Sequence, residues 1–281
     1  MSLETLKPKV AELIEKAQSG GSGLPDWDDD SPIIASGSAY PSTKNLEWEL
    51  TEKGTLRWKF IEGVAGNNRA EIFNSNSINM LSASYKKIAH KIKQVYFPDG
   101  VVKAEVVYAP NCERIRFPDT ITERHTIVAL TSLKELDLSG DFYTTIPDYY
   151  CSRMVGLEKV QICPQTTILP RNSFEHCYSL NEINLENIKR FETNCLDGSF
   201  SLTGAIVFNS ELTEITASAF RYTNFTSITF QNPTDNLPTI ANNSFQQCIG
   251  LLDIYVPWAE GAVANAPWGA TNATIHYNSE V

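Results

Sequence analysis

The densest group of potential metal ligands in this sequence is a set of carboxylates near its start. Asp26, Asp28, Asp29 and Asp30 surround Trp27, and clustered carboxylate oxygens are ligands that suit Ca²⁺. The ligand spacing of an EF-hand loop, its glycine and its terminal glutamate are all absent. A solvated acidic loop is therefore the favoured interpretation, with a cation site as the alternative.

Histidine and cysteine do not combine into a recognisable catalytic or zinc-binding pattern. No HExxH motif and no paired Cys/His spacing involves any of the four histidines, which are His90, His125, His176 and His276. His176 lies beside Phe174 and Cys177, which favours a structural role over a Cys-His nucleophile, because sequence neighbours rarely present side chains to each other. A Gly-rich phosphate loop and a G-x-S-x-G motif are also absent, so we expect neither catalysis nor a cofactor.

A recurring pattern of apolar residues indicates the fold class. Its form is apolar, two variable residues, apolar, one variable residue, apolar, and proline often follows. Start-to-start spacings are 20 to 26 residues for the eight copies, which begin at Ile92, Cys112, Leu133, Leu157, Leu180, Leu202, Phe225 and Leu251. Repeats of this length are typical of solenoids, in which each repeat supplies one supersecondary unit.

A second apolar element lies between consecutive copies. An apolar residue is followed five positions later by Phe, Cys or Leu in the pairs Ile146/Cys151, Leu169/Phe174, Phe191/Leu196, Ile215/Phe220 and Ile240/Phe245. Each repeat is too small to bury its own apolar face, so we expect the repeats to stack with strands about 4.8 Å apart. A Leu/Ile/Val ladder and a Phe ladder would then fill the space between two walls.

These motifs resemble the BspA-like (Treponema-type) leucine-rich repeat. The pattern L-x-x-I-x-(I/V/F)-P, then I-x-x-x-A/S-F-x-x-C, is matched best by residues 168–185 and 240–257. The resemblance implies an α/β-type solenoid, a right-handed coil with a parallel sheet of about eight strands. It also implies a bacterial surface or secreted protein that binds host proteins or other cells without catalysis. Irregular coils are expected where the match departs, at residues 118–133 and at Asn194-Cys195-Leu196.

The remaining sequence divides the chain into four segments. Residues 1–23 are expected to form an amphipathic helix (5–18) and a Gly/Ser linker, and residues 24–87 a β-rich cap with a hairpin over 44–62. The repeats occupy residues 88–258. Residues 259–281 form a C-terminal cap, with a helical turn at 259–266 and a strand at 273–277. Packing against the end of the last coil explains Trp258 and Trp268 better than sugar stacking does.

Two columns of exposed residues are expected on the stacked strands. The first alternates in charge, which favours a self-neutralising ladder over a charged groove: Gln94, Arg114, Glu135, Lys159, Glu182, Gly204, Ser227 and Asp253. The second is Tyr96, Arg116, Asp137, Gln161, Asn184, Ile206, Thr229 and Tyr255. Its polar and aromatic members suit a protein or glycan ligand, so we predict binding by Tyr96, Arg116, Asp137, Gln161, Asn184, Thr229 and Tyr255.

Net charge and hydropathy argue against several classes of binding partner. The net charge of −10 argues against nucleic acid and anionic membranes, and no apolar stretch approaches the roughly 20 residues of a membrane span. Residues 1–18 lack the continuous apolar region of a secretory signal, so localisation stays open. We predict a non-catalytic bacterial recognition protein. The alternative is a phage tail structural or receptor-binding protein, attached or oligomerised through residues 5–18.

Overall fold

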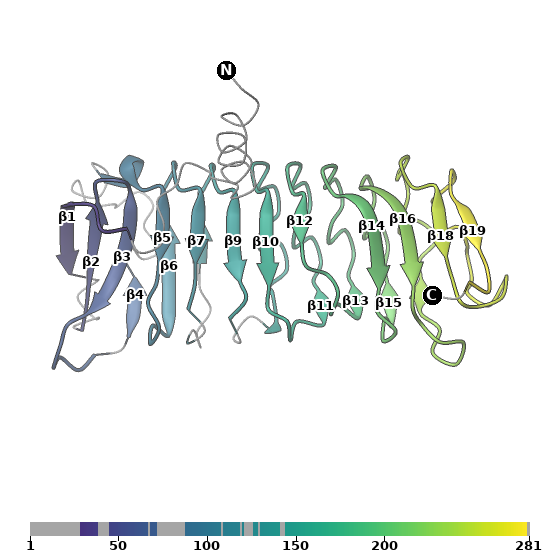
Figure 1. Ribbon diagram of the computed structural model, residues 1–281, viewed down its shortest axis with the longest axis horizontal. Coiled ribbons are helices and arrows are strands. Elements are labelled where there is room, and N and C mark those ends of the chain that lie inside the picture. The colour runs from purple at the N-terminus through teal and green to yellow at the C-terminus, as the bar shows by residue number, and fades with distance from the viewer. Residues whose placement is uncertain are drawn as a thin grey trace, which may run out of the picture.

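The computed structural model describes residues 29–38, 45–66, 68–71, 88–107, 109–118, 120, 126–128, 130–140 and 144–279. In these ranges the strands lie side by side in one elongated row, from β1 at one end to β19 at the other (Figure 1). The expected helix over residues 5–18 and its linker lie outside the described residues, and so do Asp26, Asp28 and His125. The hypotheses of oligomerisation and of phage-tail attachment through residues 5–18 depend on that helix.

The row begins with an antiparallel hairpin. It consists of β2 (Leu46–Thr51) and β3 (Thr55–Phe60), and β1 (Ile33–Ser38) pairs with the outer side of β2. Gly54 makes the turn with a φ of 101°, and a Cβ on it would lie 2.7 Å from the backbone oxygen of Lys91. The hairpin therefore closes the first coil as expected, while β1 adds a strand that the sequence did not indicate.

Eight parallel strands form the first wall of the coils, at the positions that the repeats predict. In the described residues they are β5 (Gln94–Tyr96), β7 (Arg114–Arg116), β9 (Glu135–Leu138), β10 (Lys159–Ile162), β12 (Glu182–Ile183), β14 (Thr203–Phe208), β16 (Asn224–Phe230) and β18 (Asp253–Tyr255). They belong to two sheets: β1-β2-β3-β5-β7-β9-β10-β12, and β14-β16-β18-β19 with β19 at Thr274–His276. The wall is therefore interrupted between β12 and β14.

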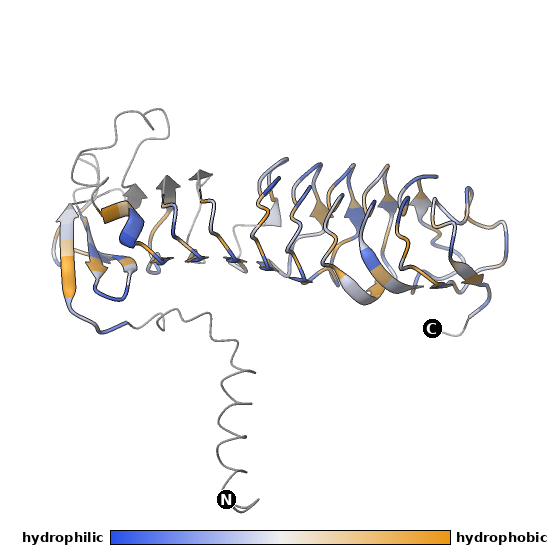
Figure 2. Cartoon of the chain, turned by 90° about the horizontal axis from the view of Figure 1, so that it is seen from above, coloured by the Kyte–Doolittle hydropathy of each residue, from blue (hydrophilic) through white to orange (hydrophobic). Residues whose placement is uncertain are grey.

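The second wall consists of shorter strands and turns. Its first sheet is β4 (Arg69–Glu71), β6 (Lys103–Val107) and β8 (Thr126–Val128), and its second is β11 (Ile168–Leu169), β13 (Arg190–Phe191), β15 (Glu214–Ile215) and β17 (Thr239–Ile240). Figure 2 shows the two walls facing each other across the coils. The described part of the chain holds almost no helix apart from the 3-10 turn η2 (Ala89–Lys91), and none that is long and apolar enough to cross a membrane.

The interior is filled by the two ladders that the sequence predicts. All five pairs of the second element are buried, and Phe220 is fully buried against the rings of Phe191, Phe208 and Phe245 at centroid distances of 4.8, 5.5 and 5.3 Å. The prediction of an irregular coil at residues 194–196 is wrong. Cys195 and Leu196 are both fully buried, and the backbone N–H of Leu196 donates to Ala219 in the next coil.

Several turns of the second wall use left-handed backbone twice, four residues apart. Examples are Asn172 with His176 and Ser218 with Tyr222. Gly198 occupies the second position in the coil between them, with a φ of 75°. These turns let the backbone N–H groups of one coil donate to carbonyls of the next, so the coils are joined on this side as well.

Both ends of the row are capped. At the C-terminal end Trp258 and Trp268 are buried against Phe230, with ring centroids 5.4 and 5.8 Å away. Their burial confirms cap packing and excludes an exposed sugar-stacking pair. The helical turn expected over residues 259–266 is wrong, because this segment forms turns and bends, while β19 supplies the expected last strand.

Candidate binding face

Four of the predicted ligand-binding residues lie next to one another on the first wall. Tyr96 on β5 is in register with Arg116 on β7, which is in register with Asp137 on β9, and Asp137 with Gln161 on β10. Arg116 is exposed and the other three are partly exposed. Because strands in a sheet are about 4.8 Å apart, these side chains form one row across four coils.

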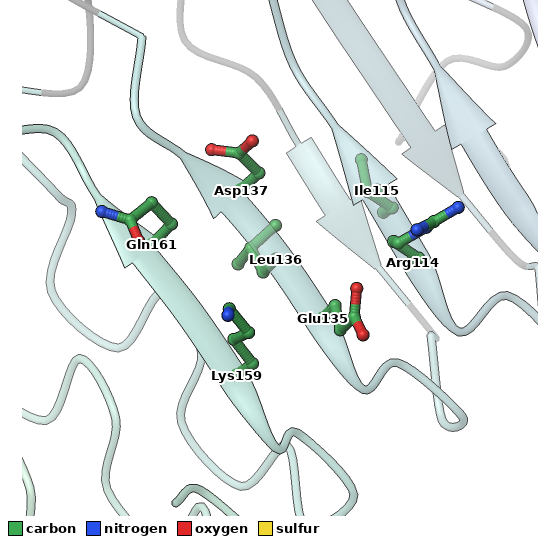
Figure 3. A pocket seen from close by; sticks show the side chains of 7 residues that line it. All are labelled: Arg114, Ile115, Glu135, Leu136, Asp137, Lys159 and Gln161. Carbon is green, nitrogen blue, oxygen red and sulfur yellow. The ribbon is translucent and has the colours of Figure 1, made fainter. Parts of the chain in front are cut away.

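A parallel row of charged residues runs beside them. Arg114, Glu135 and Lys159 are in register on β7, β9 and β10, and Lys159 forms an ion pair with Glu182 on β12. The alternation of charge therefore continues across the strands, as the self-neutralising ladder predicts. Figure 3 shows Arg114, Glu135 and Lys159 beside Asp137 and Gln161. Together with Ile115 and Leu136 these residues line a hollow on the sheet. We call the rows 96/116/137/161 and 114/135/159 the strand face.

The N-terminal end of the charged row differs from the prediction. Gln94 was expected to be exposed, but its side chain is fully buried beneath the hairpin cap. Its Nε2 donates to Thr55 Oγ1 at 2.8 Å, and its Oε1 accepts from Arg114 Nε at 3.2 Å. Gln94 therefore connects the cap to the strand face and offers nothing to a ligand.

Asn184 is a predicted ligand-binding residue whose polar atoms already have partners. Its Oδ1 accepts from the backbone N–H of Ile162 at 2.6 Å, and its Nδ2 donates to the Ile162 carbonyl at 3.0 Å. The side chain thus replaces strand pairing at the point where β12 ends. This arrangement favours a structural role for Asn184.

The register of β14 contradicts the prediction for Ile206. We expected Ala205 and Val207 to point inward and Ile206 to be exposed, yet Ile206 is buried and pairs with Ile228. The register shifts between Gly204 and Ala205, and a slip of one residue exchanges the two faces of a strand. Val207, 49% exposed, takes the place in the column that Ile206 was expected to fill.

The last two predicted residues lie at the C-terminal end of the row, on the sheet β14-β16-β18-β19. Thr229 is in register with Val207 on one side and with Tyr255 on the other. Tyr255 stacks on His276 of β19 at 4.5 Å, and His276 Nε2 lies 2.7 Å from Asp253 Oδ1. Sequence reasoning missed the role of His276 because β19 lies beyond the last copy of the repeat.

The carboxylate that was expected in an acidic loop is part of the cap. Asp29 is buried, and its carboxylate accepts from the Ser31 N–H at 3.0 Å and from the Thr51 and Thr55 hydroxyls at 2.5 and 2.6 Å. Burial alone would raise the pKa of Asp29, but these hydrogen bonds outweigh it and hold that pKa well below its ordinary value. The solvated-loop interpretation is therefore wrong for Asp29, which fastens β1 to the hairpin.

A second group of acidic residues and histidine lies on the turns. Potential ligand atoms of Glu175, His176 and Asp197 are all within 4.8 Å of one another. Arg221 already forms an ion pair with the buried Asp197. Its Nε lies 2.9 Å from Asp197 Oδ1, and its Nη2 lies 2.5 Å from Asp197 Oδ2. A guanidinium on both carboxylate oxygens disfavours a metal cation there, so the group is better explained as a bridge between coils.

The cysteines are structural. All six lie within the described ranges, and each is buried and unbridged. Burial raises the pKa of Cys177 to about 12, which keeps the thiol protonated at neutral pH. The burial of the Cys177 thiol and its raised pKa therefore argue against a nucleophile made of Cys177 and His176.

Comparison with known proteins identifies the repeat. Residues 72–181 and 144–260 match the family described as the BspA type leucine rich repeat region, in six copies. Among curated proteins no match is found.

Solved structures of leucine-rich repeat proteins are similar over much of the chain at low identity. One from Bacteroides ovatus is 19% identical with a TM-score of 0.45, over 67% of this chain and 54% of that one. This chain thus spans about half of that protein. One from Eubacterium ventriosum is 14% identical with a TM-score of 0.32, over 86% and 78%. A leucine rich cell surface protein from Faecalibacterium prausnitzii is 13% identical with a TM-score of 0.29, over 89% and 96%. The family match covers more than half of the chain, and the chain therefore belongs to the BspA-type leucine-rich repeat proteins.

Proposed function

We propose that this non-catalytic repeat protein recognises another protein through its strand face. The observation that supports this most strongly is the in-register row of Tyr96, Arg116, Asp137 and Gln161 beside the alternating charges of the next row. Fixed charges of both signs on rigid strands select a partner of complementary pattern, because a mismatched surface places like charges together. We further propose, from the family resemblance, that the protein acts at a bacterial surface.

A protein partner fits this face better than a glycan. Sugar rings are held by the open faces of aromatic side chains, and only Tyr96 contributes an aromatic ring to the strand face. Tyr255, the other predicted aromatic residue, stacks against His276 and lies on the other sheet. A mixture of an aromatic residue, an arginine and polar groups is typical of protein interfaces.

The test is a double charge exchange that preserves net charge. Arg116→Asp with Asp137→Arg reverses the pattern on the strand face. Arg190→Glu with Glu214→Arg is the matched control, because that ion pair joins neighbouring strands of the second wall at 2.9 Å. Wild-type protein and both variants are applied to host-protein and glycan arrays.

We expect the strand-face exchange to weaken binding to protein spots about tenfold or more, and the control to bind as wild type does. Binding unaffected by the strand-face exchange would overturn the assignment of this face. Binding confined to glycan spots would overturn the assignment of a protein partner.

A further inference from the structure

An exposed row of apolar residues lies on the turns that lead into the first wall. Four of its members stand two positions before the first apolar residue of a strand copy: Val155, Tyr178, Phe200 and Ile249. Tyr222 supplies the apolar side chain in the coil between Phe200 and Ile249, and its ring centroid is 6.0 Å from that of Phe200. All five are exposed. We call them the turn row, which follows the edge at which β10, β14 and β16 begin, the upper edge in Figure 1.

The fold itself does not require apolar residues at these positions. In the earlier coils the equivalent residues are His90, Pro110 and Thr131, and both His90 and Thr131 are exposed. The same turn therefore forms with polar side chains. A contiguous set of exposed apolar side chains marks an interaction site, so the turn row indicates a binding partner.

The rings of the turn row are held in place before any partner binds. Tyr178 and Phe200 stack with ring centroids 5.4 Å apart and planes 23° from parallel. The Arg221 guanidinium, bound to Asp197, lies 5.5 Å from the ring centre of Tyr222. Ordered side chains lose little freedom on association. Because Tyr178 and Phe200 turn their faces toward each other, the row presents ring edges rather than the open faces that hold sugars, which favours a protein partner.

The order of residue types in the turn row is the same in both directions. It reads aliphatic, tyrosine, phenylalanine, tyrosine, aliphatic, with Phe200 at the centre. A two-fold interface uses the same patch on both copies, so the patch must be complementary to itself. When the two-fold axis crosses the row at Phe200, Tyr178 of one copy meets Tyr222 of the other, and Val155 meets Ile249.

The charges beside the turn row fit the same arrangement. Glu175 and Arg221 each follow a residue of the Phe ladder by one position, and they lie one coil to either side of the coil of Phe200. Both side chains are partly exposed. Rotation about that axis reverses the order of the coils and keeps the same side of the row. Glu175 of each copy therefore comes opposite Arg221 of the other, which gives the contact complementary charge.

We propose that the turn row binds a second copy of this chain, in a two-fold dimer whose coils run in opposite directions. Five coils about 4.8 Å apart span roughly 19 Å, a narrow contact beside the approximately 800 Å² that each partner buries in a standard interface. We therefore expect a reversible dimer with a Kd of about 10–100 µM. The strand face lies on the outer side of β5 to β10 and not on these turns, so either proposal can fail without the other.

Sedimentation velocity of the full chain, from about 1 µM to about 500 µM, measures the dimer. We expect the sedimentation coefficient of the wild type to rise over this range. Phe200→Glu is expected to weaken the dimer at least tenfold, because it places two carboxylates at the axis. Phe60→Glu is the matched control, since Phe60 is an exposed phenylalanine on β3, outside the turn row.

A second variant separates a loss of contact from a loss of folding. Ile249 is 68% exposed, so Ile249→Glu is expected to weaken the dimer while its thermal unfolding, followed by circular dichroism, stays as in the wild type. A wild type that is monomeric at every concentration would leave the row to a partner of another kind and overturn the proposal. Dimerisation of Phe200→Glu or Ile249→Glu at the wild-type affinity would overturn it as well.

Disulfide trapping tests the direction of the coils. In the proposed dimer Val155 of one copy meets Ile249 of the other, whereas the two copies of Val155 lie four coils, roughly 19 Å, apart. A disulfide requires Cα atoms about 4.4–6.8 Å apart, and the native cysteines are buried. We expect mild oxidation to link Val155→Cys to Ile249→Cys in an equimolar mixture, and to link neither variant to itself. Linkage within one variant, or none in the mixture, would overturn the antiparallel arrangement.

Discussion

Replacement of Phe220 by alanine tests how the coils hold one another. Phe220 is fully buried, and its ring contacts those of Phe191, Phe208 and Phe245, which come from its own and adjacent coils. A truncation that leaves a cavity of this kind costs about 3–5 kcal/mol. With Phe225, whose ring centroid lies 6.2 Å away, Phe220 makes four ring pairs. Their loss, at about 0.5–1.5 kcal/mol each, places the expected cost toward the upper end of that range.

The cost should be local, because each coil of a solenoid contacts only its neighbours. Urea unfolding measures the loss of stability, and hydrogen exchange resolved by peptide measures its location. We expect protection to fall mainly around Phe220 and its neighbouring coils, while the N-terminal stack of Trp58, Phe97 and Phe117 keeps its protection. Ile249→Ala is the control, since that side chain is 68% exposed and its loss should cost less than about 1 kcal/mol. A Phe220→Ala cost below about 1 kcal/mol, or an equal loss of protection along the whole chain, would refute this reasoning.

Three further outcomes are expected. Gly198→Ala should destabilise more than Gly204→Ala in urea unfolding, because both have positive φ but only at Gly198 would the new Cβ meet His176 Nδ1, at 2.5 Å; equal losses would contradict this. The pKa of Asp29 is lowered by folding, so its contribution to stability is present above the unfolded pKa of about 3.9 and is lost as the pH falls. The difference in unfolding free energy between wild type and Asp29→Asn should therefore shrink between pH 5 and pH 2 (about the range over which such a group titrates), and a constant difference would speak against the network. Cys177 should resist iodoacetamide at neutral pH until the chain unfolds, as mass spectrometry of the alkylated protein would show; modification of the folded protein at the rate of a free thiol would disprove its burial.

Much of the fold could be predicted because only stacked coils bury apolar residues at this spacing. The first residue of every strand copy, from Ile92 to Leu251, is buried, and so are the five pairs of the second element. A 20- to 26-residue unit buries these residues only against its neighbours, so spacing alone predicts the stack and its two walls. The Phe ladder is equally visible, because Phe174, Phe220 and Phe245 each follow an apolar residue by five positions.

The register of β14 could not be predicted from the pattern. Ala205, Ile206, Val207 and Phe208 are all apolar, so the sequence allows two registers, and the copy of the motif starting at Leu202 suggested the wrong one. The structure buries Ile206 and Phe208, whose side chains present more apolar surface than those of Ala205 and Val207. Asp29 was missed for a different reason, since its partners Thr51 and Thr55 come from a hairpin more than twenty residues away.

Where the molecule can bind depends on register more than on composition. The exposed columns were derived by assuming one continuous ladder, and that assumption holds for Tyr96, Arg116, Asp137 and Gln161, whose strands remain paired in order. It fails after Ile183, where a side-chain amide replaces the backbone pairing of the next residue. The exposed columns can therefore be derived from the repeat only as far as successive strands remain paired, because a slip of one residue exchanges the two faces of a strand.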